Sequence, residues 1–440
     1  MQPEQQQRTL ADLEARLSEL DVERESIQAQ MRELRSQPPV PTAGVPAYSP
    51  LAFPQAPLTK ASAPEARLRF LLDLFHARRD VFAERFENRK TGKSGYQPVC
   101  ANLWRRPLCQ KPKAKCHECP HRMLVPLSDE VVTRHLAGQL TIGIYPLLPA
   151  ETCWFVAGDF DKGGWQEDAL AFVRICRKHG ITPALERSRS GKGAHVWIFF
   201  REELPARTAR QMAASLLTEA MATRPTMGLD SYDRLFPNQD TMPKGGFGNL
   251  IALPLQRAPA QQGNSLFLDD ELRIYPDQWA FLSSLPHMPA ADVERIATEA
   301  RLNGKIVGVR PVAMEEGQDD PWTLPPSRKA GRARRTTEAV PANIVLVLSD
   351  EVYIPKAGLP PALLNEIVRL AAFQNPEFYH AQAMRFPVYG KPRVIGCASD
   401  NGGHIGLPRG CLDDLQLLLA DWGIRTQIDD QRCNGTPIST

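Results

Sequence analysis

Apolar residues at the beginning of the chain recur at alternating spacings of three and four positions. They are Leu10, Leu13, Leu17, Leu20, Ile27, Met31 and Leu34, and Arg24 occupies the one polar position of the series. About four heptads of this kind, with Glu, Gln and Arg between them, are typical of a short coiled coil. We therefore predict a coiled coil over residues 1–36 that supports dimerisation or partner docking. The alternative is an amphipathic helix packed on its own chain.

Between residues 63 and 300 the pattern alternates between short apolar runs and helical periodicity. Strands are predicted at residues 141–147, 153–160, 181–188, 195–200 and 249–255, and helices at 166–179 and about 206–222. Strands that alternate with helices exclude an all-helical bundle and favour an α/β or α+β domain.

Two stretches rich in proline and polar residues border this region. Residues 37–62 hold seven prolines and residues 301–342 contain the basic run RKAGRARR, so both are predicted to be linkers. Phosphate contact is one hypothesis for the basic run, although simple solvation explains most such runs. From residue 343 to residue 440, strand and helix patterns return and predict a small C-terminal α/β domain.

The composition excludes some classes of protein but does not indicate a function. The chain has 440 residues, which suits about three domains. Its 42% hydrophobic and 23% charged residues are ordinary for a soluble protein. The net charge of +3 says little about partners, so a nucleic-acid surface must be local. No apolar run reaches the length of a membrane span and the N-terminus is unlike a secretory signal, so we expect a cytoplasmic protein.

Four of the nine cysteines lie within twenty residues, inside the segment 96–123. They are Cys100, Cys109, Cys116 and Cys119, and the last two have the C-x2-C spacing that wraps two thiolates around one tetrahedral ion. In a reducing compartment such a cluster is more typical of metal ligands than of disulfides. We predict a structural Zn2+ site in which His117 or His121 could replace one cysteine. The alternative is a loop with unpaired cysteines.

The same segment carries one aromatic residue among several cations. They are Trp104, Arg105, Arg106, Lys111, Lys113 and Lys115. This combination suits single-stranded nucleic acid, because bases stack on the ring while the cations neutralise phosphates. Binding of single-stranded nucleic acid to this zinc-binding segment is therefore a second hypothesis for residues 96–123.

A pair of carboxylates ends the apolar run 153–160. Asp159 and Asp161 are two positions apart, so on a strand both side chains point to one face of the sheet. Two hard oxygen donors on one face can hold Mg2+ or Mn2+, which take waters and substrate phosphates as further ligands. A lone D-x-D pair is common in solvated loops, but here a hydrophobic strand carries it to the end of a sheet.

A glycine-rich turn, SRSGKGAH, separates the strands predicted at 181–188 and 195–200. Its glycines let backbone N–H groups approach a phosphate, Ser188, Ser190 and Lys192 add donors, and His195 opens the next strand. The turn is not a Walker A loop, because no Ser or Thr follows GKG. Alone it is more typical of a hairpin turn with a core histidine; beside the D-x-D pair it favours a phosphate site.

Further acids and cations follow the second predicted helix. Asp230, Asp233 and Asp240 offer a third carboxylate, and Arg234 and Lys244 offer charge for a triphosphate or a template. Two-metal phosphoryl transfer needs several carboxylates, a phosphate cradle and a cation that converge. Residues 159–244 contain all of these groups.

Taken in order, these motifs resemble the archaeo-eukaryotic primase (AEP) superfamily. The segments ERSRSGKGAHVWIFF and SYDRLFPNQDTMPKGGFGNLIALPLQ are more similar still to the primase–polymerase (prim-pol) region of TOTE conflict-system proteins. CRISPR-associated primase–polymerases are relatives of that region. The resemblance covers residues 65–290 and includes the four-cysteine element. The C-terminal block resembles the segment that precedes a superfamily-two helicase in those proteins.

The resemblance implies an α+β fold with an AEP/RRM-like catalytic core over residues 63–300 and a zinc-binding insertion. It implies that Asp159 and Asp161 bind the catalytic metals. Asp233 is chosen as the third carboxylate, with Asp230, three residues away, left as its alternative. Nucleotide binding is assigned to Ser188, Ser190, Lys192, His195 and Arg234.

The implied activity is that of a DNA primase–polymerase, a nucleotidyltransferase that copies single-stranded DNA with NTPs or dNTPs through two Mg2+ or Mn2+ ions. The resemblance also implies a bacterial conflict or defence system, a template or primer strand, and a helicase region in the same or a companion chain. No membrane partner is expected. One alternative is a metal-dependent nuclease, which would not need a triphosphate cradle. Another is a non-catalytic scaffold for single strands, which would not need the paired acids.

Overall fold

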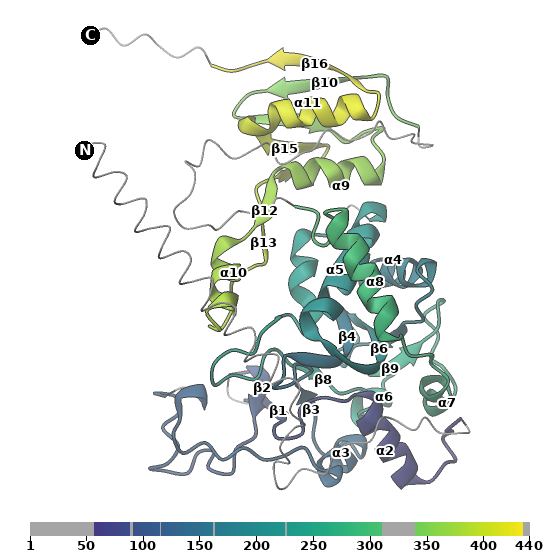
Figure 1. Cartoon of the computed structure of the whole chain (residues 1–440), viewed down its shortest axis with the longest axis vertical. Coiled ribbons are helices and arrows are strands. Elements are labelled where there is room, and N and C mark those ends of the chain that lie inside the picture. The colour runs from purple at the N-terminus through teal and green to yellow at the C-terminus, as the bar shows by residue number, and fades with distance from the viewer. Residues whose placement is uncertain are drawn as a thin grey trace, which may run out of the picture. The chain divides into compact units, whose positions relative to one another are not determined.

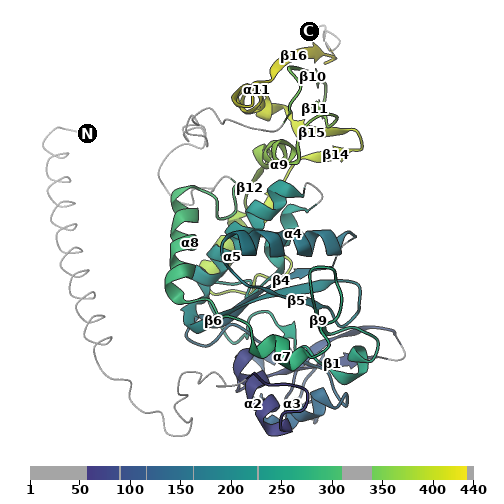
Figure 2. The same ribbon diagram turned by 90° about the vertical axis from the view of Figure 1, so that its right-hand side faces the viewer.

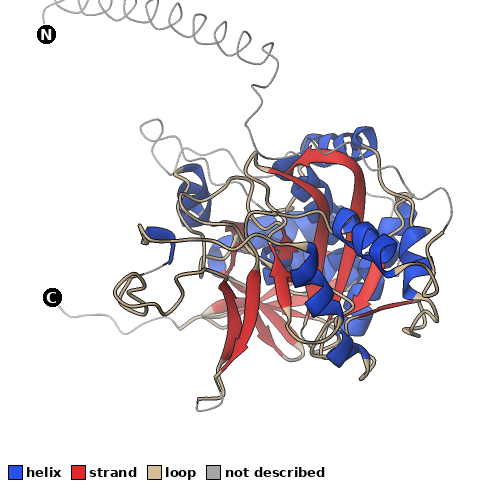
Figure 3. Cartoon of the chain, turned by 90° about the horizontal axis from the view of Figure 1, so that it is seen from below, coloured by secondary structure: helices blue, strands red, loops and turns tan. Residues whose placement is uncertain are grey.

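The computed structural model describes residues 57–88, 91–114, 116–161, 163–224, 227–309 and 339–433. The coiled coil predicted at 1–36, most of the first linker and the basic run RKAGRARR lie outside these residues and stay predictions. Helices and strands occur together in the described chain (Figure 3), and none of its helices is long and apolar enough to cross a membrane.

A five-stranded sheet organises the described part of residues 57–309 (Figure 1). Its strands, in spatial order, are β7 (Leu235–Phe236), β4 (Thr152–Phe160), β6 (Ala194–Pro205), β5 (Ala184–Arg187) and β9 (Leu266–Leu268). Each strand pairs antiparallel with its neighbour. Because helices pack on an antiparallel sheet, the predicted α+β class is confirmed.

Three helices cover one face of this sheet, as Figure 2 shows: α4 (Trp165–Lys178), α5 (Ala206–Thr223) and α8 (Ala290–Leu302). Buried residues on α4, among them Phe172 and Cys176, share a core with Val196 of β6. The spacing of four between Phe172 and Cys176 keeps both on one side of the helix.

The opposite face of the sheet packs on a second layer. That layer contains α2 (Pro64–Leu74), α3 (Asp129–Leu136) and a sheet in the order β2 (Ser94–Pro98), β1 (Ala83–Glu87), β3 (Ile142–Ile144) and β8 (Ile251–Ala252). The ring of Phe75 lies 4.9 Å from that of Trp197 and 5.3 Å from that of Phe199. Both faces of the main sheet are thus buried, which explains why residues 153–160 are apolar without strict alternation.

Shorter elements connect these layers. They are η1 (Cys116–Glu118), η2 (Leu229–Arg234), α6 (Arg257–Ala260) and α7 (Gln278–Ser283). Of these, η2 matters most for function, because it leads directly into β7 beside β4.

His135 of α3 is fully buried, so the pH dependence of the unfolding free energy tests the packing of this core. Its Nδ1 accepts a hydrogen bond from the Ile142 amide (3.2 Å) and its Nε2 donates to the Pro254 carbonyl (3.1 Å), so the ring is neutral. Burial lowers the pKa of His135 from 6.5 to about 4. The unfolded state therefore binds more protons than the folded state between these two values. Stability from this residue is complete above pH 6.5 and is lost as the pH falls toward 4.

We expect this titration to remove about 3 kcal/mol of unfolding free energy across that interval. In His135→Gln the side-chain amide can still accept from Ile142 and donate to Pro254, but it does not titrate. The variant should therefore show a flatter pH dependence in urea unfolding followed by circular dichroism. An unchanged slope between pH 6.5 and 4 would show that the folded state tolerates the charged ring.

Residues 339–433 form another sheet. Its strands, in spatial order, are β14 (Ser399–Asn401), β15 (His404–Pro408), β11 (Glu351–Pro355), β10 (Asn343–Leu348) and β16 (Arg425–Asp430). The helices α9 (Pro361–Leu370) and α11 (Leu412–Asp421) share its core. Within this sheet β10 and β16 pair in parallel.

A segment between α9 and β14 packs elsewhere. This hairpin segment, residues 372–396, consists of β12 (Ala372–Gln374), α10 (Pro376–Ala383) and β13 (Val394–Gly396). Ala372 and Val394 are buried in the core cluster that contains α4 and α5. The sequence prediction treats residues 343–440 as one small domain, whereas this segment joins the core of the preceding residues.

Candidate active site

The candidate site is built on a row of residues that crosses the main sheet. Glu186 of β5 lies opposite His195 of β6, and His195 lies opposite Asp159 of β4. Residues directly opposite one another in antiparallel strands project to the same face. Farther along this face, the apolar side chains of Ala157 and Trp197 belong to the hydrophobic core. The row therefore lies at the edge of that core, where polar side chains begin.

Glu186 fixes the histidine of this row. The carboxylate is 1% exposed and accepts hydrogen bonds from Nδ1 of His195 (2.9 Å) and Nε1 of Trp197 (2.9 Å). Burial opposes a charged imidazole, but the charge and hydrogen bond of Glu186, followed by the charge of Asp159, raise the pKa of His195 above its usual value. Nε2 of His195 lies 3.8 Å from Oδ1 of Asp159. Glu186 thus orients the ring, and the raised pKa favours the charged form, which suits contact with an anion.

Sequence reasoning missed Glu186. The strand predicted at 181–188 contains Glu186 without giving it a role, although a glutamate that follows Ala184 and Leu185 within a predicted strand is a usable signal. A buried carboxylate needs a partner, and a histidine on the next strand is the nearest kind of residue that can supply one.

The second acid of the D-x-D pair faces the third acidic segment. Asp161 forms an ion pair with Nη1 of Arg234, and Nε of Arg234 lies 3.5 Å from Oδ2 of Asp230. Pairing of Gly158 with Leu235 brings η2 alongside the end of β4. One cation therefore lies between the carboxylates of Asp161 and Asp230.

Asp233 is directed elsewhere. Its Oδ1 accepts a hydrogen bond from the backbone amide of Arg393 (2.8 Å), in the hairpin segment. Burial raises the pKa of the Asp233 carboxyl. Asp240, the remaining acid considered, forms an ion pair with Arg210 of α5 at 2.5 Å. Of the three acids, Asp230 is the one that shares a cation with Asp161.

The glycine turn packs directly against the D-x-D pair. A Cβ atom on Gly193 would lie 2.5 Å from the Phe160 carbonyl and 3.0 Å from Cα of Asp161, so only glycine fits there. Gly191 has a φ of 74°, in the left-handed region. Ser188 and Ser190 contact each other through their hydroxyls (3.2 Å).

The end of this turn is open to solvent. The side chain of Lys192 is exposed, and its backbone amide donates to Oγ of Ser190 (3.3 Å). The predicted phosphate turn and the predicted carboxylates are thus adjacent, with Lys192 free to approach an anion.

The acids of this site have the chemistry of a Mg2+ or Mn2+ site. No three His, Cys, Asp or Glu side chains converge as a metal site within the residues that the structure describes. Hard carboxylate oxygens are nevertheless the ligands that these ions prefer, and the guanidinium between Asp161 and Asp230 shows that both acids face one cation. Asp159, Asp161 and Asp230 are therefore donors of suitable chemistry for a divalent ion, although they do not form a metal site in the described part of the chain.

The cysteine segment 96–123, the knuckle, has the donors of a zinc site. All four cysteines and His121 line one pocket of about 20 Å3, which holds about one water-sized sphere. The backbone amides of Lys111 and Trp104 lower the pKa of the Cys109 thiol, which favours the thiolate that zinc binds. The donor types suit zinc, but these side chains do not converge as a metal site within the described residues, so the Zn2+ site stays a prediction.

We expect purified protein to carry about one zinc ion per chain, the stoichiometry of a closed four-ligand site. Cys116→Ser and Cys119→Ser should each lose it, as measured by elemental analysis, and should make the knuckle sensitive to limited proteolysis. Cys397→Ser is the matched control, because Cys397 is exposed and lies outside the pocket. Equal zinc content in all four proteins would rule out the site.

Carboxylates beside a glycine-rich turn are an arrangement compatible with phosphoryl transfer. Residues 66–296 match the family model described as "TOTE conflict system, Archaeo-Eukaryotic Primase domain". The match spans more than half of the 440 residues, and the chain belongs to this family. Its members are generally nucleotidyltransferases and usually depend on divalent metals.

Other comparisons are more distant. The polymerase domain of Mycobacterium tuberculosis Ligase D, in complex with DNA, is 15% identical with a TM-score of 0.29, over 55% of this chain and 88% of that one. The AEP domain of the cyanophage S-2L primase–polymerase is 14% identical with a TM-score of 0.23, over 45% of this chain and 95% of that one. The comparison with curated proteins found no match.

Proposed function

We propose that this protein is a primase–polymerase that transfers nucleotides from NTPs or dNTPs onto a strand copied from single-stranded DNA. The observation that carries the proposal is the contact between the glycine turn at Gly193 and the strand end at Asp161. Phosphates bound to this turn would lie beside the carboxylates. Family membership supports the same reaction class.

Each acidic and basic group then has a role. Asp159, Asp161 and Asp230 would hold two Mg2+ or Mn2+ ions, which would neutralise charge on the phosphates and on the attacking oxygen. His195 is oriented by Glu186, whose charge raises the pKa of the ring, and it donates from Nε2 to a phosphate oxygen of the incoming nucleotide.

The glycine turn completes the phosphate site. Its backbone amides and the hydroxyls of Ser188 and Ser190 donate to phosphate oxygens, and Lys192 and Arg234 add positive charge. The 3′-hydroxyl group of a primer, or of a first nucleotide, gives its proton to solvent, and its oxygen forms a bond to the α-phosphorus. The bond from that phosphorus to the β-phosphate oxygen breaks, and pyrophosphate leaves.

The template is assigned to the knuckle side of the protein. Trp104 is 58% exposed, and Arg105 and Lys113 are exposed in the same segment. An exposed ring among cations suits the bases and phosphates of a single strand. As part of the proposal, a helicase region in the same or a companion chain supplies the strand within a conflict system. The coiled coil predicted at residues 1–36 would then support dimerisation.

An extension assay tests the function. The protein is incubated with single-stranded DNA, labelled dNTPs or NTPs, and Mg2+ or Mn2+, with and without a primer. Product ladders that need template and metal are the expected result. Binding of the strand without any synthesis would favour the scaffold, and shortening of a labelled strand would favour the nuclease.

A further inference from the structure

The hairpin segment, residues 372–396, contacts the loop that carries the third acid. This segment lies outside residues 66–296, which match the primase family. A Cβ atom on Gly396 would lie 3.2 Å from Cδ1 of Leu229, so β13 packs on the first residue of η2. The segment therefore touches the element that holds Asp230 and Arg234 without being part of the family's domain.

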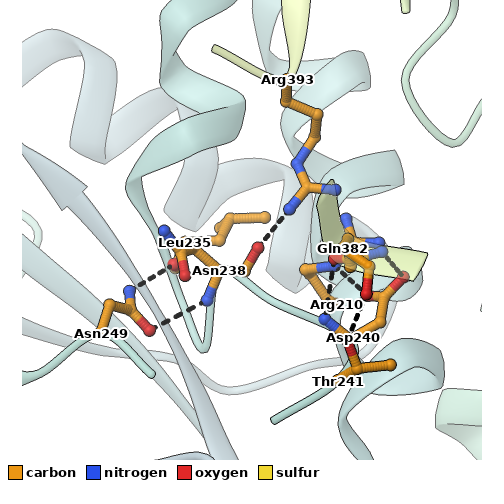
Figure 4. Close-up of polar contacts among 8 residues, drawn as sticks. All are labelled: Arg210, Leu235, Asn238, Asp240, Thr241, Asn249, Gln382 and Arg393. Carbon is orange, nitrogen blue, oxygen red and sulfur yellow. Dashed lines mark hydrogen bonds and ion pairs between the residues drawn. The ribbon is translucent and has the colours of Figure 1, made fainter. Parts of the chain in front are cut away.

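Arg393 forms hydrogen bonds at both ends of the short stretch 233–238, which contains β7. Its backbone amide donates to Oδ1 of Asp233 (2.8 Å), and its Nη2 donates to the carbonyl oxygen of Asn238. Figure 4 shows the guanidinium of Arg393 directed at Asn238. The side chain is 0% exposed, and its guanidinium carbon lies 4.3 Å from the ring centre of Phe378. One residue thus fixes the chain on either side of the strand that pairs with β4.

Gln382 of α10 holds the next part of the loop. Its Oε1 accepts from the amide of Asp240 (3.1 Å) and its Nε2 donates to Oδ2 of the same residue (3.1 Å). Its carbonyl oxygen accepts from the hydroxyl of Thr241 (3.1 Å). Asp240 is also paired with Arg210 of α5, so the loop is clamped between α5 and α10 (Figure 4).

The buried charges in this contact indicate that it fixes the position of the loop at residues 233–241, and does not serve only to stabilise the packing of the two segments. Burial, followed by the charge of Arg210, lowers the pKa of Arg393 to about 10, so the guanidinium is still charged at neutral pH. Desolvating charged groups is costly, and apolar residues of similar volume often give equal or greater stability. Directional hydrogen bonds, in contrast, fix the geometry of what they join.

We propose that Arg393 is a positioning residue for catalysis: it holds η2 and β7 so that Asp230 faces Asp161 across the metal site. The inference rests on the proposed nucleotidyl transfer. It makes the hairpin segment part of the polymerase active unit, although that segment lies outside the primase domain defined by the family.

The test compares Arg393→Met and Arg393→Lys with the full-length wild type. Primer extension is measured against Mn2+ concentration and against dNTP concentration. A shift of about 1 Å in a catalytic group can cost about 100-fold. We therefore expect Arg393→Met to lower kcat by about 10- to 100-fold and to raise the Mn2+ requirement, with little change in KM for dNTP. Arg393→Lys, which keeps the charge, should recover part of the rate.

Leu415→Ala is the structural control, because Leu415 is buried in the core of the C-terminal sheet and has no part in the loop contacts. It should lower the melting temperature without changing the Mn2+ requirement. Hydrogen exchange of residues 229–241 gives a readout that does not need activity, and it should be faster in Arg393→Met than in Leu415→Ala.

Three outcomes are distinguishable. Unchanged Mn2+ dependence and unchanged exchange in Arg393→Met would overturn the proposal, as would effects equal to those of Leu415→Ala. A wild-type protein without extension activity would instead overturn the proposed function. In that case the exchange data alone decide whether Arg393 holds the loop.

Discussion

Asp159→Asn and Asp161→Asn are each expected to abolish nucleotide incorporation, with losses of about a thousandfold or more. Asparagine keeps the size of each side chain but removes the negative charge that, in the proposed function, holds a divalent ion. Electrostatic stabilisation by such ions contributes several kcal/mol to phosphoryl transfer, and about 1.4 kcal/mol corresponds to a tenfold change in rate. Losing most of that stabilisation accounts for the expected size of the effect.

The measurement is primer extension under single-turnover conditions, with melting temperatures recorded for each variant. Both acids are partly exposed, and the ion pair of Asp161 with Arg234 lies near the surface, so folding should change little. Asp270→Asn is the control, since Asp270 is a surface acid paired with Arg177. Retention of more than about a tenth of the wild-type rate in either variant would remove that acid from the chemistry, because loss of metal stabilisation leaves far less.

The main elements of the fold were predictable because their patterns are strong. The apolar run 153–160 is β4 (Thr152–Phe160), and the helix expected at 166–179 is α4 (Trp165–Lys178). The pairing of strands was not predictable, because an apolar run does not determine which other strand it pairs with. The strand expected at 249–255 is an example: only Ile251–Ala252 forms β8, and it pairs with β3 rather than with the main sheet.

The site was predictable in its residue types more than in its geometry. The D-x-D pair and the glycine turn are adjacent, as their chemistry suggested. Opposition of Asp159 and His195 depends on strand register, which the sequence does not specify, and Glu186 was missed for the same reason.

The role of the hairpin segment was also beyond the sequence. Apolar residues such as Phe378, Ala381 and Val394 predict burial but not the core in which they are buried. A segment that packs in the core of another part of the chain has the same local pattern of apolar residues as a segment that packs in the core of its own sheet. The polar contacts of Arg393 and Gln382 became visible only once the loop at 233–241 lay beside them.

The second large effect separates the two candidates for the third carboxylate. Asp230→Asn should lower the rate by about 100-fold or more, because it removes a charge that faces Asp161 across one cation. Asp233→Asn should stay within about threefold of wild type, since the amide oxygen of asparagine can still accept from the Arg393 amide and a neutral hydrogen bond contributes about 1 kcal/mol.

Both variants are measured at limiting and saturating Mn2+, because loss of a metal ligand shows first where metal is scarce. Asp230→Asn should need more metal for half-maximal rate, while Asp233→Asn should not. The reverse pattern would identify Asp233 as the ligand. In that case η2 would have to turn on substrate binding and release Asp233 from the Arg393 amide.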